Sequence, residues 1–264
     1  MYQLRPDPIR TTRIIAIANH KGGAAKTTTA VNLAAGLAKR GRRIMLFDLD
    51  PQGNASAWLG GSGDSGAFAV LTESQTIGSQ LTKSSVEGLS LVPASQRLAG
   101  AERLLSNELA AEQALKRRFD ETDLSHWDYV IIDTPPALNL LTINALSAAN
   151  EVLVPVEAHV MALSGVAQIV STIGAVRSRL NPGLKLAGFL LCRFDPRTRH
   201  STEVRERLAE RFGHQVLRTI IRENVRLAEA PSFSEPIETY APTSQGAADY
   251  AALATEIIAM EPTE

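Results

Sequence analysis

One short segment near the start of the chain carries residue types suited to holding phosphate. Its residues are Lys21, Gly22, Gly23, Ala24, Ala25, Lys26, Thr27 and Thr28. Paired glycines let a backbone turn sharply and point its N–H groups inward, and the helix expected to follow adds the positive end of its dipole. In such an anion cradle Lys26 reaches the β- and γ-phosphates of a nucleotide, and the Thr27 hydroxyl ligates Mg²⁺. The segment therefore predicts a nucleoside triphosphate site.

The segment departs from the strict phosphate-loop pattern G-x-x-x-x-G-K-[ST]. His20 and Ala25 stand where that pattern has glycine, and Lys21 adds a second lysine at the front of the loop. Two outcomes are open at Ala25. Either its methyl group crowds the β-phosphate, or the backbone needs no positive φ there and alanine costs little. Crowding would favour a nucleotide-dependent scaffold that hydrolyses little ATP.

Two later runs of strand character end in aspartate. Asp48 lies near the end of the run 43–49 and Asp50 directly follows it. They face one way because side chains two residues apart in an extended segment lie on the same side. Carboxylates at such a strand end can orient an attacking water or hold a metal. Asp133 closes the run 129–132, an arrangement in which the carboxylate takes Mg²⁺ through water. With the phosphate loop, these acids predict a magnesium-dependent ATPase.

The remaining pattern predicts how these residues are brought together. Apolar runs of strand length alternate with amphipathic runs of helix length, which indicates a parallel sheet with helices on both faces. Ligands of such sheets bind at the carboxyl ends of the strands. The expected strands are 13–19, 43–49, 89–92, 129–132, 151–156, 185–192 and 216–221. The expected helices are 27–40, 96–119, 140–149, 160–180, 201–212 and 244–260, and the glycine-rich stretch 53–66 is expected to be a loop.

Composition limits the class of protein. The chain has 264 residues, of which 44% are hydrophobic and 21% charged, with a net charge of −1, as in an ordinary soluble globular protein. A single cysteine excludes a disulfide scaffold and any site that needs two thiolates per chain. No stretch approaches the roughly 18 apolar residues of a membrane span, so we expect a cytoplasmic protein. We predict a flexible arm at 1–12 and one α/β domain at 13–264, a mostly parallel, doubly wound sheet of P-loop NTPase type.

The phosphate loop resembles the deviant Walker A motif of the ParA/MinD family of ATPases, and the resemblance covers most of 13–260. It implies ATP or ADP and Mg²⁺ as ligands and a slow ATPase. In that family the lysine equivalent to Lys21 crosses into the partner subunit's site when ATP joins two monomers, as an arginine finger does. The resemblance also implies that Asp50 positions the hydrolytic water and that Asp48 supports the metal shell or its own loop. Lys21, Lys26 and Asp50 are therefore the expected catalytic residues, and Thr27, Asp48 and Asp133 the expected magnesium groups.

Two further segments resemble the chromosomal ParA (Soj) branch, one at 53–55 and one at 224–232. In that branch the residues before the second segment close over the adenine, usually in the order Pro-Arg-Asn. Here the order is Arg222-Glu223-Asn224. Asn224 can keep its contact, and the Arg222 guanidinium can stack on a purine. The nucleotide contacts expected from motif and resemblance are Lys21, Gly22, Gly23, Ala24, Ala25, Lys26, Thr27, Thr28, Arg222 and Asn224.

Arginines gather between 193 and 229, where nine stand against six acids. Arginine–phosphate contacts give sequence-independent, salt-sensitive DNA binding, although a solvated helix face with ion pairs has the same composition. The resemblance points to Arg197 and Arg226 as DNA contacts, and charge alone adds Arg199 and Arg218.

The resemblance also implies the partners of the protein. It implies a homodimer in the ATP-bound state, nonspecific double-stranded DNA, a ParB-type centromere-binding protein that stimulates hydrolysis, and a nucleoid-associated location. The acidic C-terminal segment 254–264 has no basic residue, so we expect no membrane partner of the kind that MinD has. A ParA relative that positions another cargo remains an alternative, beside the scaffold with little hydrolysis.

Overall fold

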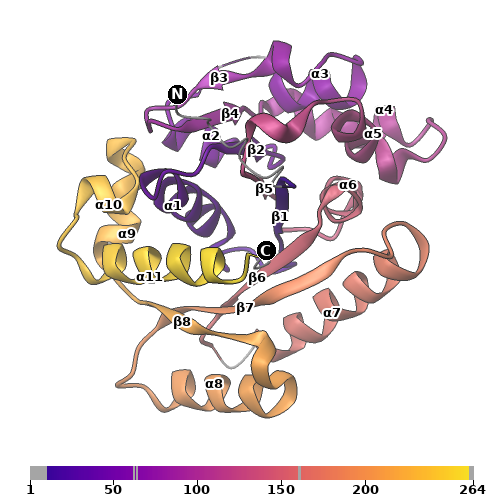
Figure 1. The fold of residues 1–264 in the computed structure, drawn as a ribbon. Helices are drawn as coiled ribbons and strands as arrows, with labels where there is room; N and C mark the ends of the chain where they lie inside the picture. Colours follow the sequence, from indigo (N-terminus) through magenta and orange to yellow (C-terminus); the bar gives the residue numbers. More distant parts are fainter. Residues whose placement is uncertain (1–10, 62, 64, 160–161, 262–264) are drawn as a thin grey trace, which may run out of the picture.

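A single sheet crosses the computed structural model, which describes residues 11–61, 63, 65–159 and 162–261 (Figure 1). Its strands are β1 (Arg13–Ile17), β2 (Ile44–Asp48), β3 (Thr82–Lys83), β4 (Leu89–Val92), β5 (Tyr129–Asp133), β6 (Glu151–Glu157), β7 (Lys185–Phe194) and β8 (Val216–Arg222). The α-helices are α1 (Lys26–Lys39), α2 (Asn54–Trp58), α3 (Gly66–Thr72), α4 (Ala101–Leu105), α5 (Ala114–Asp120), α6 (Leu140–Ala148), α7 (Ala162–Arg179), α8 (Arg199–Phe212), α9 (Val225–Glu229), α10 (Ile237–Tyr240) and α11 (Gln245–Ala259).

The strand order places β1 inside the sheet. The order is β3-β4-β2-β5-β1-β6-β7-β8, and all neighbouring pairs are parallel except β3 and β4. The chain crosses over at β1, which lies between β5 and β6. In a parallel sheet the loops that follow such neighbouring strands meet at one edge, which is where ligands bind. The loops after β1, β2 and β5 carry the predicted phosphate and metal groups.

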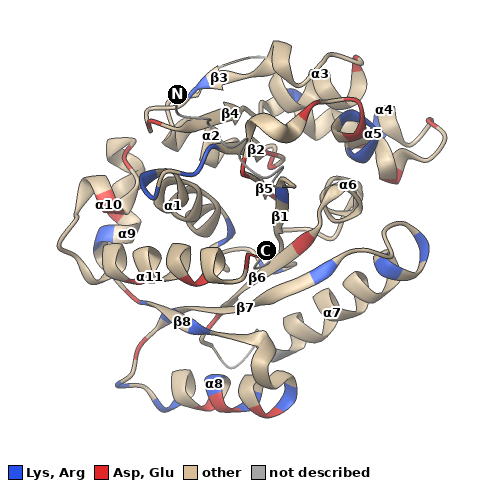
Figure 2. Ribbon diagram, in the orientation of Figure 1, with Lys and Arg blue, Asp and Glu red and all other residues tan. Residues whose placement is uncertain are grey.

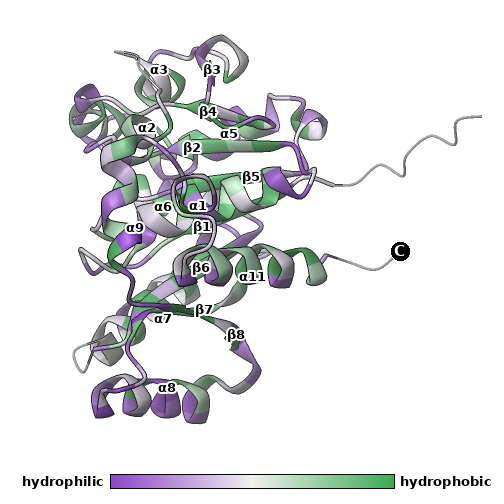
Figure 3. Ribbon diagram, turned by 90° about the vertical axis from the view of Figure 1, so that its left-hand side faces the viewer, coloured by the Kyte–Doolittle hydropathy of each residue, from purple (hydrophilic) through white to green (hydrophobic). Residues whose placement is uncertain are grey.

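Helices cover both faces of the sheet, and each face has its own apolar core. Ile15 and Ile17 of β1 pack with α1, α2, α10 and α11 on one face. Ile14 and Ala16 pack with helices α3 to α8 on the other. Successive side chains of a strand point to opposite faces, so a strand buried on both faces must be apolar throughout. Figure 3 shows these strands as an apolar layer, with hydrophilic residues along the outer helix α8.

The predicted α/β class and mostly parallel sheet are confirmed, but two stretches differ from expectation. The expected loop 53–66 contains helix α2, because Gly53 adopts a left-handed conformation (φ 62°) and starts a turn that buries Ala55 and Trp58. The expected helix over 96–119 is interrupted between α4 and α5. Ala110 is left-handed there (φ 53°), and Leu109 beside it is 95% exposed, so no apolar face holds a helix together at this point. Helices α3, α9 and α10 and strand β3 were not expected from the sequence.

Both ends of the described chain make polar contacts near the edge of the sheet at which the parallel strands begin. Residues 1–10 lie outside the described residues, so an arm there stays a prediction, but the Thr12 hydroxyl lies 2.8 Å and 2.9 Å from the carbonyl oxygens of Leu124 and Trp127. After α11, Glu261 pairs with Arg42 at 2.9 Å. Within the described ranges, no helix has the length and apolar character needed to cross a bilayer.

Carboxylates from α11 cover the outer edge of β8. Glu256 accepts hydrogen bonds from the backbone N–H groups of Arg218 and Thr219, each at 2.9 Å, and Asp249 accepts from that of Arg222 at 2.9 Å. Burial opposes ionisation of Glu256, but these hydrogen bonds outweigh it and lower the pKa of its carboxyl group. An edge strand normally presents unpaired backbone groups to solvent, whereas three N–H groups of β8 are paired within the chain.

We expect Glu256→Gln to lower the free energy of unfolding by about 1–2 kcal/mol at neutral pH, because hydrogen bonds to a charged acceptor are lost. A carboxyl group whose pKa is lower in the folded state stabilises above its unfolded pKa, and that contribution disappears as the pH falls through the folded value. The difference from wild type should therefore shrink below about pH 4. Urea unfolding at two pH values measures it, with exposed Glu206→Gln as control. An undiminished difference in acid would contradict this account of Glu256.

Candidate nucleotide site

The loop between β1 and α1 has the backbone shape of a phosphate loop. Gly23 and Ala25 are both left-handed, with φ angles of 76° and 63°. No atom lies within 4 Å of the position that a Cβ would take at Gly23. Glycine is therefore required at Gly23 by its backbone conformation and not by lack of space. Helix α1 begins directly afterwards at Lys26, and the Thr29 N–H closes its first turn on the Ala25 carbonyl at 2.9 Å.

The conformation of Ala25 corrects one expectation from the sequence. The possibility that the backbone needs no positive φ at this residue is wrong, because Ala25 has φ 63° and ψ 27°. An L-residue other than glycine pays about 1–2 kcal/mol in the left-handed region, since its Cβ approaches the following carbonyl oxygen. The loop thus contains a strained residue immediately before Lys26, where the common pattern has glycine.

Ala25→Gly is expected to raise the free energy of unfolding by about 0.5–1 kcal/mol. Relief of the left-handed strain is partly offset by the larger entropy that glycine has in the unfolded chain. Urea unfolding of the nucleotide-free protein measures the change. Ala24→Gly is the matched control, because Ala24 is buried and does not have a positive φ, so this variant should be destabilised. A destabilised Ala25→Gly protein would show that strain at this position is not the dominant effect.

The two lysines of the loop have separate surroundings. Lys26 is buried, and its Nζ donates a hydrogen bond to the Lys21 carbonyl oxygen at 3.2 Å. Burial lowers the pKa of Lys26, while the charges of Asp133 and Asp50 act in the opposite sense. The Nζ of Lys21 lies instead 2.7 Å from Oε2 of Glu157, at the end of β6. Lys26 therefore lies within the loop, and Lys21 is directed to a neighbouring strand.

The Asp133 carboxylate is buried beside the loop. Neither of its oxygens has a partner at hydrogen-bond distance among the described residues. Burial and the neighbouring Asp48 carboxylate raise the pKa of Asp133, whereas the nearby Thr27 hydroxyl and Lys26 ammonium favour its charged form. Buried polar groups are normally paired, and a carboxylate beside a threonine hydroxyl offers the oxygen ligands that Mg²⁺ prefers. Asp133 and Thr27 therefore fit a magnesium ion bound with a nucleotide.

Asp48 is paired in register with Asp133 but has different contacts. Its carboxylate accepts hydrogen bonds from the Asp50 N–H at 3.1 Å, from the Ser56 N–H at 2.9 Å and from the Ser56 hydroxyl at 2.6 Å. Burial nevertheless raises the pKa of Asp48 to about 6. Of the two roles expected for Asp48, this geometry favours support of its own loop. Ser56 was missed from the sequence, because a serine in a glycine-rich stretch carries no distinct signal.

The remaining expected site residues are Asp50, predicted to be catalytic, and the predicted nucleotide contacts Arg222 and Asn224, at and just after the end of β8. Asp50 is buried, and its Oδ1 accepts the Gln52 N–H at 3.0 Å. Asn224 caps helix α9 through the Arg226 N–H at 2.9 Å. The Arg222 guanidinium is held on Asp249 of α11, with Nη2 2.5 Å from Oδ1. Stacking of Arg222 on a purine would require that pair to break.

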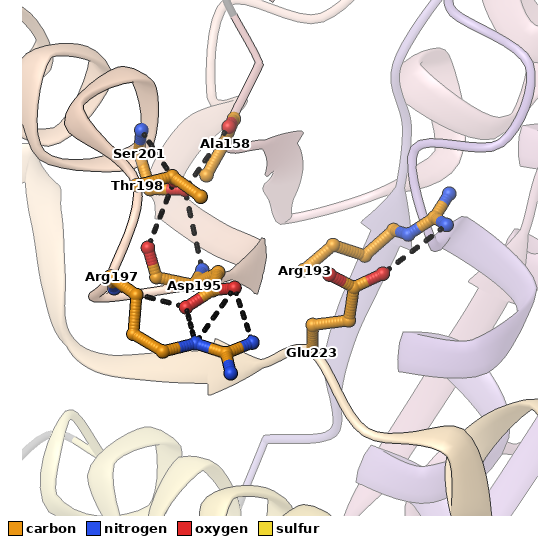
Figure 4. A network of polar contacts seen from close by, with 7 residues as sticks. All are labelled: Ala158, Arg193, Asp195, Arg197, Thr198, Ser201 and Glu223. Carbon is orange, nitrogen blue, oxygen red and sulfur yellow. Dashed lines mark hydrogen bonds and ion pairs between the residues drawn. The ribbon is translucent and has the colours of Figure 1, made fainter.

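The two arginines that the resemblance assigns to DNA follow the carboxyl ends of β7 and β8. Arg197 is 86% exposed and makes a two-pronged contact with Asp195, with Nε and Nη2 2.9 Å and 2.8 Å from its two oxygens (Figure 4). Arg226 is also exposed and pairs with Glu229 at 2.8 Å. Both are placed at the sheet edge that carries the phosphate loop.

The two arginines chosen on charge alone occupy different places. Arg199 begins α8, next to Arg197, on a helix along which basic and acidic residues are intermixed (Figure 2). Arg218 is 89% exposed near the start of β8 and lies 3.6 Å from Glu256 on the outer edge of the sheet. Arg197, Arg199 and Arg226 thus lie at the edge where the parallel strands end, whereas Arg218 lies on the outer side of the last strand, β8.

In this parallel sheet a lysine-bearing loop follows the inner strand β1, and buried aspartates end the next two strands on one side of it, β5 and β2. This arrangement defines a P-loop nucleoside triphosphatase. A family described as an AAA domain matches residues 12–186. The chain is 46% identical to the chromosome-partitioning ATPase Soj of Thermus thermophilus, covering 94% of this chain and 96% of that one. It is 42% identical to the sporulation initiation inhibitor protein Soj of Bacillus subtilis, covering 94% and 98%. A structure named cobyrinic acid a,c-diamide synthase from Mycobacterium smegmatis, with bound ADP and magnesium, is 38% identical with a TM-score of 0.80 over 93% of each chain. The chain belongs to the ParA/MinD family of ATPases.

Proposed function

We propose that this protein is a DNA-partitioning ATPase whose DNA affinity is controlled by its nucleotide. The observation that carries the proposal is the buried, unpartnered Asp133 carboxylate beside Thr27 and Lys26. A buried carboxylate without a partner is charged only if a cation compensates it, and the adjacent loop has the residues for a phosphate chain. ATP or ADP would lie on the loop residues 21–28, with Mg²⁺ near Thr27 and Asp133. The relative with bound ADP and magnesium supports this ligand pair.

The DNA-binding part of the proposal rests on linkage between ATP and dimerisation. An ATP-bound homodimer presents two copies of the arginine-bearing edge to one duplex, so the second contact forms at a high effective concentration. ATP can raise the DNA affinity only if it favours the state that presents both edges. A ParB-type partner would stimulate hydrolysis and so release the DNA. The two Soj relatives support this assignment, and it implies a cytoplasmic, nucleoid-associated protein.

The deciding measurement is binding to a nonspecific duplex with ATP, ADP or no nucleotide, at 50 and 200 mM salt. We expect binding only with ATP and at least about 10-fold weaker binding at the higher salt concentration, because arginine–phosphate contacts release counterions. A matched sample with Lys26→Ala should fail to bind under any condition. Binding that is absent, or indifferent to nucleotide, would overturn the proposed cycle.

The same measurement tests one alternative function, whereas a second alternative is distinguished only by its partner protein. The left-handed Ala25 next to Lys26 favours a scaffold that binds nucleotide but hydrolyses little, and ATP-dependent DNA binding without phosphate release would support it. A ParA relative that positions another cargo would bind DNA in the same way and differ only in its partner.

A further inference from the structure

Glu157, at the end of β6, forms ion pairs with two basic side chains, one at each of its carboxylate oxygens. Its Oε2 lies 2.7 Å from Nζ of Lys21, and its Oε1 lies 3.3 Å from Nη1 of Arg193 on β7. The Glu157 side chain is only 19% exposed, and that of Lys21 is 34% exposed. A carboxylate this buried is destabilised if it loses its only cation. With two cations, Glu157 can lose either one and remain paired.

The backbone of β7 is distorted where Arg193 meets this carboxylate. Arg193 is left-handed, with φ 52°, at a register shift between β7 and β8. Irregularities of this kind re-aim side chains near functional sites. The guanidinium contacts both Glu157 and Glu223. Its Nη2 is 3.8 Å from Oε1 of Glu223 (Figure 4). Arginine in the left-handed region costs about 1–2 kcal/mol, so the surrounding contacts keep this guanidinium in place against local strain.

We propose that Glu157 is a positioning residue that keeps Lys21 within its own subunit until ATP-dependent dimerisation, and that Arg193 lets it release the lysine. The inference rests on the proposed function, with its ATP-bound homodimer, and on the crossing of Lys21 to the partner subunit's nucleotide that the family resemblance implies. In the monomer the lysine is held on Glu157. When Lys21 leaves, Arg193 remains on Glu157 and prevents an unpaired buried carboxylate. The two neighbours of Lys21 thus act in opposite directions, because Glu157 retains the lysine and Arg193 favours its departure.

Two substitutions should therefore shift dimerisation in opposite directions. With Mg²⁺ and a non-hydrolysable ATP analogue, Glu157→Gln should lower the protein concentration at half-dimerisation by about 2- to 5-fold, in line with the strength of a partly exposed ion pair. Arg193→Gln should raise it by a similar factor, because Glu157 then depends on Lys21 alone. Analytical ultracentrifugation measures both. Arg207→Gln is the matched control, since Arg207 forms an exposed pair with Glu203 on α8 and should leave dimerisation unchanged.

A double-mutant cycle separates this role from a general structural effect. If Glu157 acts through Lys21, the effect of Glu157→Gln should disappear in a Lys21→Ala background. A direct readout uses the nucleotide-free monomer, in which the rate of Lys21 acylation by an amine-reactive ester is followed by mass spectrometry. Glu157→Gln should raise that rate about 2- to 5-fold and Arg193→Gln should lower it. Lys116, which pairs with Asp120 on α5, serves as the internal reference.

The outcomes distinguish this inference from the proposed function. A wild-type protein that does not dimerise with the ATP analogue would overturn the proposed function. In that case the acylation rates alone would decide whether Glu157 retains Lys21. If wild type dimerises but Glu157→Gln does so at the same or a higher concentration, the inference is wrong while the proposed function survives. An acylation rate unchanged in both variants would also overturn it.

Discussion

Replacing Asp50 by alanine is expected to slow ATP hydrolysis by about 100-fold or more while ATP binding and ATP-dependent DNA binding persist. A positioned carboxylate that orients or deprotonates a water contributes about 10²–10⁴-fold to a rate. Asp50 is buried beside Lys26, and among the described residues its carboxylate accepts one hydrogen bond, from the Gln52 N–H. Its removal should therefore disturb the reaction more than the fold.

Phosphate release and the binding of a fluorescent ATP analogue should be measured on the same Asp50→Ala sample. Asp120→Ala is a suitable control, because Asp120 is an exposed acid paired with Lys116 on α5, and it should hydrolyse at the wild-type rate. DNA bound by the Asp50 variant should also dissociate more slowly when ATP is the only nucleotide. Hydrolysis at the wild-type rate would remove Asp50 from the catalytic residues. Loss of ATP binding would indicate a structural role in place of a catalytic one.

The second large effect is expected at the edge of the sheet that is proposed to bind DNA. Arg226→Glu should weaken nonspecific DNA binding by about 100-fold or more at low salt, because an attractive phosphate contact becomes a repulsive one at each of the two edges of a dimer. Arg226 is 55% exposed, and its ion pair with Glu229 is a surface pair, which contributes little to stability. The Asn224 cap uses the backbone N–H of residue 226, so the substitution leaves that hydrogen bond in place.

The measurement for Arg226→Glu is a DNA titration beside a dimerisation assay with the ATP analogue. Arg207→Glu on α8 is the matched control, because it reverses one equally exposed charge and should change the affinity much less. Dimers should form as in wild type. If DNA binding and dimerisation are lost together, Arg226 acts on the dimer and its assignment as a DNA contact is wrong.

The sequence predicted those parts of the fold and site that depend on the spacing of residues close together in the chain. The run from β1 through the loop to Lys26 is contiguous, and Asp48 and Asp133 each close an apolar strand, so a parallel sheet brings them to one edge. Long-range contacts could not be read in this way. Lys21 and Glu157 are separated by 136 residues, and their pairing depends on β6 lying beside β1.

Local conformation also escaped prediction where neighbouring elements determine it. The left-handed backbone at Ala25, directly before α1, contradicts the preference of alanine. The break at Ala110 likewise interrupts a run with good helix formers. Propensity is a weak guide at such positions, because packing of the flanking helices selects the conformation.

The carboxylates of α11 that accept hydrogen bonds from β8 also affect the tendency of this chain to aggregate. Glu256 and Asp249 occupy N–H groups of the last strand, and the opposite rim of the sheet is β3, which has only two residues. Neither edge strand presents a long row of unpaired backbone groups with which a strand of another chain could pair and start a fibril. Both features therefore disfavour strand-to-strand association between copies of the chain.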